Sequence, residues 1–326
     1  MDWPRTALVF LLMIPAGTTV CTGQGVRVES LFADTQFRRG FLLSYPDSSN
    51  GRAVEKVLNF GAGNNVPVWR LCQWATKHSL ASSPCVRGAD GSFSYENETK
   101  RVVVCHADSP HRGLILDIRG GAEYGARPRQ AGESWPHLLV EQDALRLWAL
   151  DKLEAVRFRI RVRLLHSKNG IPAGEYDPKL HAAQFQMFFI VKNIRPQSTD
   201  RGNYFWFGVP FYDSRHDIPP AYMAADAGKK DATGKFIYTV AGAALGETTL
   251  QTGQWVAVNV DLLPHIVKGL QEAAKRGYFR SSDPRDYAVA NMNLGWEIPG
   301  TFDAAVQVQD LEIAAVLSNG RGGTAP

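Results

Sequence analysis

The chain has 326 residues and a formal net charge of +4, with 44% hydrophobic and 21% charged residues. This composition excludes a largely disordered chain, and the small net charge does not demand a nucleic-acid partner. The length suits one large all-β domain or two ordinary domains.

The N-terminus predicts a secretory signal peptide over residues 1–25. Arg5 supplies a positive charge, Ala7–Ala16 is apolar but too short to span a bilayer, and small and polar residues follow. We therefore expect a secreted or periplasmic protein. The alternatives are a lipid anchor at Cys21, which the bulky Val20 disfavours, and a buried N-terminal element. No other stretch is apolar enough to predict stable membrane insertion.

The chain contains four cysteines, and three of them remain if Cys21 leaves with the signal. Cys72, Cys85 and Cys105 allow one disulfide and one free thiol in an oxidising compartment. The sequence leaves the pairing open. The spacing of these cysteines is not that of a zinc site, so we predict no structural zinc.

The predicted elements are almost all β-strands. Residues 158–164 alternate between apolar and arginine side chains, which predicts a half-buried antiparallel strand. Gly, Pro, Asn and Asp clusters separate the other predicted strands, which are Leu114–Ile118, Trp135–Gln142, Ala183–Lys192, Tyr204–Phe211, Phe236–Val240, Val256–Val260, Met292–Ile298 and Ala305–Ala315. One amphipathic helix is predicted over Leu262–Tyr278, with Asp261 as its cap and Pro264 in its first turn.

Many strands with one helix, and no alternation of strand and helix, predict an all-β fold. We expect an antiparallel β-sandwich or jelly roll. No dip in hydrophobicity divides the chain, so residues 26–319 are predicted to form a single domain. Residues 320–326 are predicted to be a disordered tail.

The segment Tyr204–Arg215 is the most aromatic part of the chain. Alternation places Phe205, Phe207, Val209 and Phe211 on an apolar face. It places Trp206 and Tyr212 on the other face, interrupted by Gly208, which would let a ligand or another chain approach. Aromatic rings with polar edges suit the flat faces of sugars. A second layer of core packing over these rings is the alternative.

The segment from Trp135 to Gln142 predicts a second part of the site. Trp135, His137 and Glu141 share one face of a strand, as expected of a saccharide cleft. His137 is a candidate general base. Glu141 is a candidate acid, or it fixes the tautomer of His137. A salt-bridged surface with a satisfied histidine is the alternative.

Three further residues are candidate ligand contacts. Gln184 and Gln186 share a strand face and carry amides that can bind hydroxyl groups or carboxylates. Arg215 belongs to a charged cluster, Asp213–Asp217, at the end of a strand, where loops often carry function. Each of these groups also fits an ordinary solvent-exposed surface.

Four arginines on alternate positions, Arg157, Arg159, Arg161 and Arg163, repel each other unless acidic groups compensate them. Either an acidic polysaccharide binds there, or aspartates and glutamates of neighbouring strands pair with them.

The metal and motif signals are weak. Asp226 and Asp231, or Asp310 at a change of parity, are candidate ligands of a structural calcium ion, and no other cofactor is predicted. The sequence lacks a GxSxG elbow, a Walker loop, HExxH and a GxGxxG that opens a helix. Carboxylates from separate strands can still meet in a cleft, so catalysis is not excluded.

Three C-terminal segments, Trp255–Asp261, Asn293–Gly300 and Ala305–Ala315, resemble the closing strands of secreted jelly-roll carbohydrate-active modules. The resemblance is to the broad concanavalin-like and galactose-binding-like sandwiches and rests on no diagnostic motif. It implies saccharide recognition on a concave sheet or at loop ends, and in some members lyase or hydrolase activity.

Our first hypothesis is a secreted protein that binds a polysaccharide or oligosaccharide. Acidic glycans are among the candidate ligands, and no nucleic-acid partner is expected. Trp135, Trp206 and Tyr212 would stack on the sugar, and Gln184, Gln186 and Arg215 would supply polar contacts. The alternative is a polysaccharide-cleaving enzyme on the same fold. A lyase would use His137 and Tyr212, and a hydrolase would use Glu141 and Asp213. A structural envelope protein is the third hypothesis.

Overall fold

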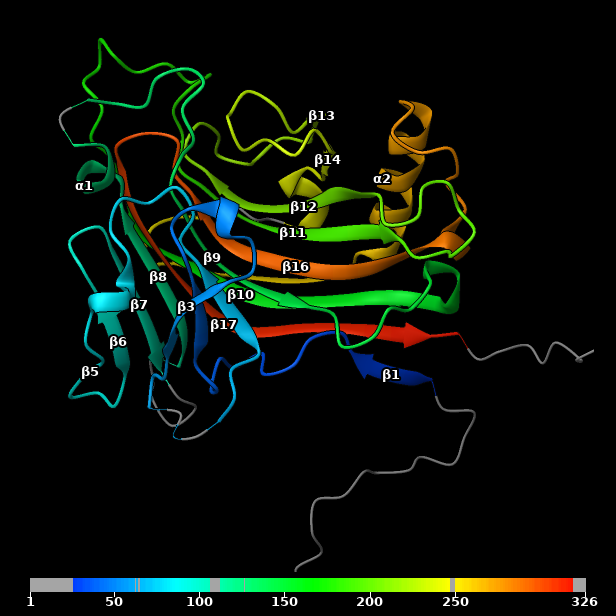
Figure 1. Cartoon of the computed structure of the whole chain (residues 1–326), viewed down its shortest axis with the longest axis horizontal. Coiled ribbons are helices and arrows are strands. Elements are labelled where there is room, and N and C mark those ends of the chain that lie inside the picture. The colour runs from blue at the N-terminus through cyan, green and yellow to red at the C-terminus, as the bar shows by residue number, and fades with distance from the viewer. Residues whose placement is uncertain are drawn as a thin grey trace, which may run out of the picture.

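The computed structural model describes residues 26–61, 63, 65–105, 112–125, 127–246 and 250–318. Two β-sheets run along the long axis of the molecule, with α1 near one end and α2 near the other (Figure 1). The expected signal peptide and the expected C-terminal tail lie outside the described residues. Among the described helices, none combines the length and the apolar character needed to cross a membrane.

The first sheet has eight strands in the order β15-β10-β17-β8-β7-β6-β5, and β1 pairs with β17. All its pairings are antiparallel. Its strands are β1 (Arg27–Ser30), β5 (Val86–Arg87), β6 (Phe93–Glu96), β7 (Lys100–Cys105), β8 (Gly113–Arg119), β10 (Leu153–Asn169), β15 (Trp255–Asp261) and β17 (Phe302–Leu317).

The second sheet has nine strands in the order β13-β14-β12-β11-β16-β9-β4-β2-β3. The pairs β12–β14 and β2–β4 are parallel, and the other pairs are antiparallel. Its strands are β2 (Phe41–Ser44), β3 (Val54–Leu58), β4 (Trp69–Cys72), β9 (His137–Asp143), β11 (Gln184–Asn193), β12 (Tyr204–Asp213), β13 (Tyr222–Ala225), β14 (Phe236–Thr239) and β16 (Tyr287–Glu297).

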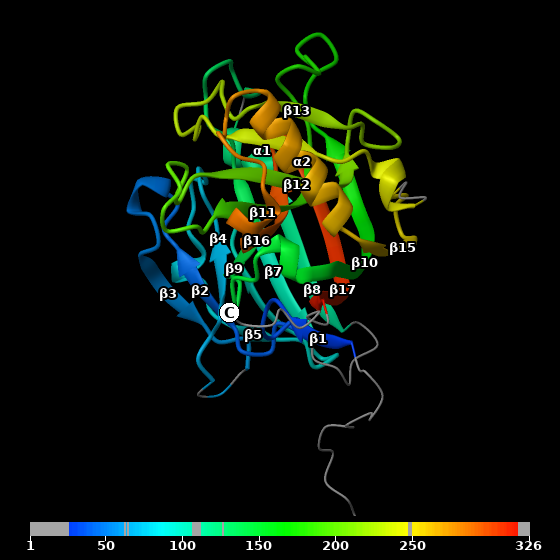
Figure 2. The ribbon, with the colours of Figure 1, turned by 90° about the vertical axis from the view of Figure 1, so that its right-hand side faces the viewer.

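The core lies between the two sheets. The long strands β10 and β11 alternate buried apolar residues with more exposed ones, while the central strands β16 and β17 are buried along most of their length. Helix α2 (Leu263–Lys275) buries Ile266 and Leu270 in the same core and covers one end of the sandwich (Figure 2). The predicted helix is present but shorter, and its N-cap is Leu262 rather than Asp261. Asp261, one residue earlier, accepts a hydrogen bond from the Leu263 backbone N–H through Oδ1 at 2.9 Å. Helix α1 (Gly120–Tyr124) is a single short turn.

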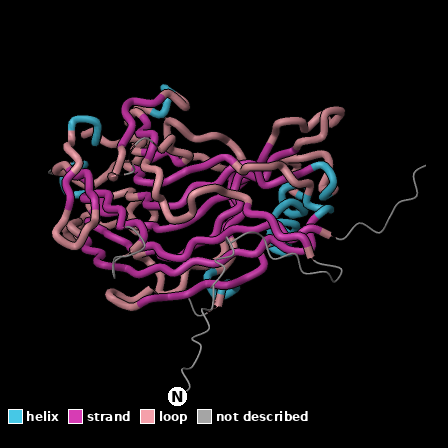
Figure 3. Tube along the Cα trace, turned by 90° about the horizontal axis from the view of Figure 1, so that it is seen from below, coloured by secondary structure: helices cyan, strands magenta, loops and turns pink. Residues whose placement is uncertain are grey.

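The predicted all-β sandwich is confirmed, and strands dominate the trace (Figure 3). Each strand predicted between residues 114 and 315 is present, but β10 and β16 are considerably longer than predicted, and the short strand β13 was not predicted. The sequence did not resolve the seven strands that precede residue 106. The three described cysteines form no disulfide with one another, because Cys72 and Cys105 are buried separately and Cys85 is exposed.

Gly295 on β16 is the point where the backbone of β9 approaches most closely. A Cβ atom added there would lie 2.2 Å from the Leu138 carbonyl oxygen. We expect Gly295→Ala to lower the free energy of unfolding by roughly 1–3 kcal/mol, because backbone must move to make room. Urea denaturation measures this loss. Gly174→Ala is the matched control, since no atom lies within 4 Å of its added Cβ. Equal stability of the two variants would contradict the expectation.

Candidate functional site

A row of four polar side chains crosses the face of the nine-stranded sheet that points away from the core. Strand pairing places Asp213 beside Gln184, Gln184 beside Glu297, and Glu297 beside His137. The row therefore crosses β12, β11, β16 and β9 at one end of the sandwich. Three of these residues were predicted from the sequence, and Glu297 was not.

A β-bulge in β12 determines which residues reach this face. Phe185 pairs with Tyr212, but the next residue, Gln186, pairs with Pro210, so Phe211 is the extra residue. The bulge brings Asp213 onto the polar face together with Trp206. It also turns Tyr212 toward the core side, where its ring meets the edge of Trp296 with centroids 6.0 Å apart. This corrects the expectation that Trp206 and Tyr212 share a face.

Glu297 is the best-connected residue of the row. Its carboxylate accepts hydrogen bonds from Trp135 Nε1 at 2.9 Å and from Gln186 Nε2 at 3.1 Å. His137 Nε2 lies 3.6 Å from Glu297 Oε2. Burial alone would raise the pKa of Glu297, but hydrogen bonds and positive charge from its neighbours lower that pKa to about 2. Glu297 is therefore an ionised acceptor at neutral pH.

The predicted pair of Trp135 and His137 is present, but both are covered. The Trp135 ring carries the Arg129 guanidinium 4.7 Å from its centroid and the Lys229 ammonium 4.4 Å from its centroid. A ring that two cations already contact is a poor stacking surface for a sugar. His137 is 6% exposed, and its Nδ1 has no hydrogen-bond partner among the described residues. Trp135 therefore orients Glu297 rather than forming an open platform.

The other end of the row opens into a pocket of about 650 Å³. Tyr212, Asp213, Ser214, Arg215, His216, Asp217, Leu250 and Gln251 line it. Arg215 holds Asp213 with two side-chain hydrogen bonds, from Nε at 2.8 Å and from Nη2 at 2.5 Å. Gln184 Nε2 donates a further bond to Asp213 at 2.9 Å. Burial opposes ionisation of Asp213, but these donors lower its pKa.

The aromatic residues of the same sheet face gather farther along β12 and β11. Trp206 meets Tyr204 and Phe188 edge to face, with centroids 5.5 Å and 6.0 Å apart. Trp206 Nε1 also donates to Thr233 Oγ1 at 3.3 Å. A Cβ at Gly208 would lie 2.4 Å from a Thr239 side-chain atom and close to Phe188. The space that Gly208 leaves is occupied by the side chains of Thr239 and Phe188.

The predicted catalytic pairs are not brought together. Glu141 forms a buried ion pair with Arg70, and its pKa is raised by burial although the nearby arginines oppose the shift. Two strands, β16 and β11, separate Glu141 from Asp213. His137 and Tyr212 lie on opposite faces of the sheet, because Tyr212 pairs with the core residue Phe185. Neither the hydrolase pair nor the lyase pair named from the sequence is assembled.

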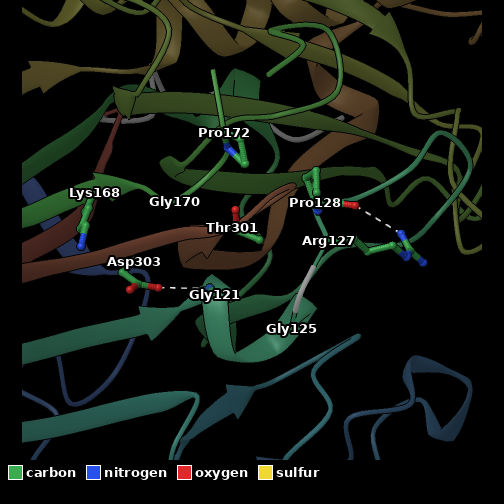
Figure 4. Close-up of a pocket in the computed structure, with 9 residues that line it drawn as sticks. All are labelled: Gly121, Gly125, Arg127, Pro128, Lys168, Gly170, Pro172, Thr301 and Asp303. Carbon is green, nitrogen blue, oxygen red and sulfur yellow. Dashed lines mark hydrogen bonds between the residues drawn. The ribbon is translucent and has the colours of Figure 1, made fainter. Parts of the chain in front are cut away.

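A second pocket, of about 210 Å³, lies at the turn between β16 and β17 (Figure 4). Arg127, Lys168, Thr301 and Asp303 line it together with three glycines and two prolines. Asp303 accepts a hydrogen bond from the Gly121 backbone N–H at 3.1 Å, and the Thr301 hydroxyl has no partner among the described residues. The sequence offered no signal for this pocket, because its residues come from segments far apart in the chain, including α1, β10 and β17.

No protein-family model matches the chain, and no curated protein matches it in sequence. Solved structures match only its arrangement of strands. An engineered Cel12A cellulase derived from that of Rhodothermus marinus shares 14% identity, with a TM-score of 0.38, over 72% of this chain and 96% of that chain. A family 12 xyloglucanase from Bacillus licheniformis shares 7%, with a TM-score of 0.40, over 72% and 97%.

A family 11 xylanase from Neocallimastix patriciarum shares 10% identity, with a TM-score of 0.33, over 72% of this chain and 95% of that chain. This likeness agrees with the sequence-based resemblance to jelly-roll carbohydrate-active modules. At these identities and scores it carries no argument about activity. The function must be argued from the side chains.

The candidate calcium ligands are engaged elsewhere. Asp226 accepts bonds from the Thr233 backbone and hydroxyl, and Asp231 accepts one from Ser134. Asp310 has a positive φ of 52° at the predicted change of parity, and its carboxylate contacts Arg112 and Arg161. Within the described part of the chain, no three His, Cys, Asp or Glu side chains are grouped as metal ligands would be.

Proposed function

We propose that the chain binds a saccharide in the pocket where β12 ends, as a non-catalytic carbohydrate-binding protein outside the cytoplasm. The observation that carries the proposal is the 650 Å³ pocket, which the paired Asp213 and Arg215 line together with the half-buried Tyr212. A fixed carboxylate and guanidinium offer acceptors and donors to sugar hydroxyl groups, and an aromatic ring offers an apolar surface. Both kinds of contact are needed by a sugar.

The electrostatics favour binding over hydrolysis. Asp213 and Glu297 are the carboxylates of the polar row, and one strand separates them, which sets their backbones about 10 Å apart. A glycoside hydrolase needs one protonated and one ionised carboxyl group. The pKa values of Asp213 and Glu297 are both lowered, so neither retains the proton that a general acid must supply.

A matched pair of arginines tests the pocket. Arg215→Gln is expected to weaken binding to a retained polysaccharide at least tenfold, which is about 1.4 kcal/mol. Arg285→Gln is the control, because Arg285 holds Asp283 across the same two-residue spacing at an exposed site. Affinity gel electrophoresis against neutral and acidic polysaccharides measures the change. Equal retention of both variants would refute the pocket as the binding site.

Two further measurements complete the test. Reducing ends and absorbance near 235 nm are measured on the same polysaccharides. A rise in absorbance would show β-elimination, and a rise in reducing ends alone would show hydrolysis. Either result would overturn the proposal that the protein is non-catalytic. If Arg215→Gln does not fold, Asp217→Asn replaces it, because Asp217 is exposed at the rim of the pocket. Absence of retention for every glycan would favour a structural envelope role.

A further inference from the structure

The outer face of the eight-stranded sheet carries a straight ladder of four arginines on β10. Arg157, Arg159, Arg161 and Arg163 alternate with Phe158, Ile160 and Val162, which are at most 1% exposed. All four guanidinium groups therefore leave the sheet on one side. Alternate residues of a strand lie about 6.8 Å apart, so the ladder is about 20 Å long.

The residues beside the ladder compensate its charge only in part. On β17 the partners of Arg161 and Arg163 are the neutral Gln309 and Gln307. Arg159 lies 4.0 Å from Glu312, and Arg161 lies 3.6 Å from Asp310.

Asp310 also serves Arg112, at 3.0 Å, so it is shared between two guanidinium groups. The Arg157 side chain has no hydrogen bond or ion pair with another described residue. Asp261, opposite Arg157 on β15, uses Oδ1 to accept the backbone N–H groups of Val156 and Leu263. Five arginines thus face three carboxylates, which leaves the face positively charged.

An aromatic ring lies within the ladder. Trp255 on the edge strand β15 is half-buried, and its centroid is 4.8 Å from the Arg161 guanidinium and 4.9 Å from that of Arg163. These contacts hold both guanidinium groups beside a flat apolar surface. Arg163 Nη2 also donates to Gln307 Oε1 at 2.5 Å, and Gln307 is 1% exposed, so the end of the ladder is fixed in place.

We propose that this arginine ladder is a second binding site, which takes an extended acidic glycan through its carboxylate or sulfate groups. Guanidinium forks bind such groups with paired hydrogen bonds, and the Trp255 ring holds the forks of Arg161 and Arg163 side by side on the sheet. A nucleic acid fits less well, because the whole chain carries a net charge of only +4. The ladder lies on the other sheet from the Asp213 pocket, so the two proposals stand independently.

The test uses the mature chain on immobilised heparin and on a polyuronate, as sulfated and carboxylated probes. The variant Arg157→Gln, Arg159→Gln, Arg161→Gln is expected to elute at clearly lower NaCl and to bind at least tenfold more weakly at 50 mM NaCl. The control Arg38→Gln, Arg39→Gln, Lys275→Gln removes the same charge from exposed residues elsewhere. We expect it to stay within twofold of the unmodified chain.

Three results would overturn the proposal. The first is equal elution of the ladder variant and its control, which would reduce the effect to net charge. The second is competition by duplex DNA as strong as that by heparin, which would remove the preference for a glycan. The third is an equal loss in Arg215→Gln, which would place the acidic glycan in the other pocket. If the triple variant does not fold, the single variant Arg157→Gln replaces it, because the Arg157 side chain has no partner whose loss would destabilise the fold. This variant must still elute at a lower NaCl concentration than the unmodified chain.

Discussion

Replacing Glu123 by alanine is expected to lower the free energy of unfolding by about 3–5 kcal/mol. Glu123 and Lys100 form an ion pair whose side chains are 1% and 0% exposed, with Oε1 and Nζ 3.1 Å apart. Lys100 Nζ also donates to Thr99 Oγ1 at 2.8 Å, and Glu123 Oε2 accepts the Lys77 backbone N–H at 2.6 Å. The truncation leaves a buried ammonium group without its counter-ion.

Chemical denaturation at pH 7 measures the loss of unfolding free energy. Two further variants serve as controls for its cause. Glu154→Gln removes an exposed carboxylate and is expected to change stability by less than about 0.5 kcal/mol. The double variant Lys100→Met, Glu123→Leu is expected to be more stable than Glu123→Ala, because no uncompensated charge remains. A loss below about 1 kcal/mol in Glu123→Ala would show that the pair does not stabilise α1 against β7.

Individual strands could be predicted from the sequence where one face of the strand is exposed to solvent and the other is buried. The arginines of β10 alternate with core residues, so periodicity alone identified that strand. The opposite holds for β4, where all four residues from Trp69 to Cys72 are buried and no alternation is visible. The other missed strands before residue 106 are only two to six residues long, and β1, β3 and β5 are mostly exposed or half-buried, so none of them shows a sustained alternation.

Only those parts of the candidate site could be predicted whose residues lie close together in the sequence. Trp135 and His137 were recognised because they are two residues apart in the sequence, although β9 begins only at His137. Glu297 was missed, because only the pairing of β16 with β9 and β11 brings it to these residues, and pairing is not written in local sequence. Tyr212 was misplaced, because one extra residue in β12 reverses the parity of all that follows.

This dependence on pairing also explains why the hydrolase hypothesis named Glu141. On β9, Glu141 shares a face with His137, and alternation predicts that correctly. The strand opposite decides what each side chain meets, and Glu141 meets Arg70 while His137 meets Glu297. Ionisable groups of one strand face therefore acquire different roles from their cross-strand neighbours.

Glu297 is expected to make the stability of the fold depend on pH in acid. Its folded-state pKa is about 2, and the ordinary value for a glutamate is 4.5. Between these values the unfolded chain binds a proton that the folded chain does not, so stability falls as pH falls. The contribution is fully present above about pH 4.5 and is lost as pH drops through about 2. It amounts to roughly 3 kcal/mol, with burial included in the shift.

Glu297→Gln tests this contribution. The variant is expected to be less stable than the unmodified chain at pH 7, and its stability should fall less steeply between pH 5 and pH 2. Denaturation midpoints across that range measure both quantities. Glu154→Gln is again the control, and it should keep the steep fall of the unmodified chain because Glu154 is exposed. Parallel curves for Glu297→Gln and the unmodified chain would show that the donors of Trp135, Gln186 and His137 do not favour the ionised carboxylate. The argument against hydrolysis is that Asp213 and Glu297 are both ionised, so these curves test the part of that argument that concerns Glu297.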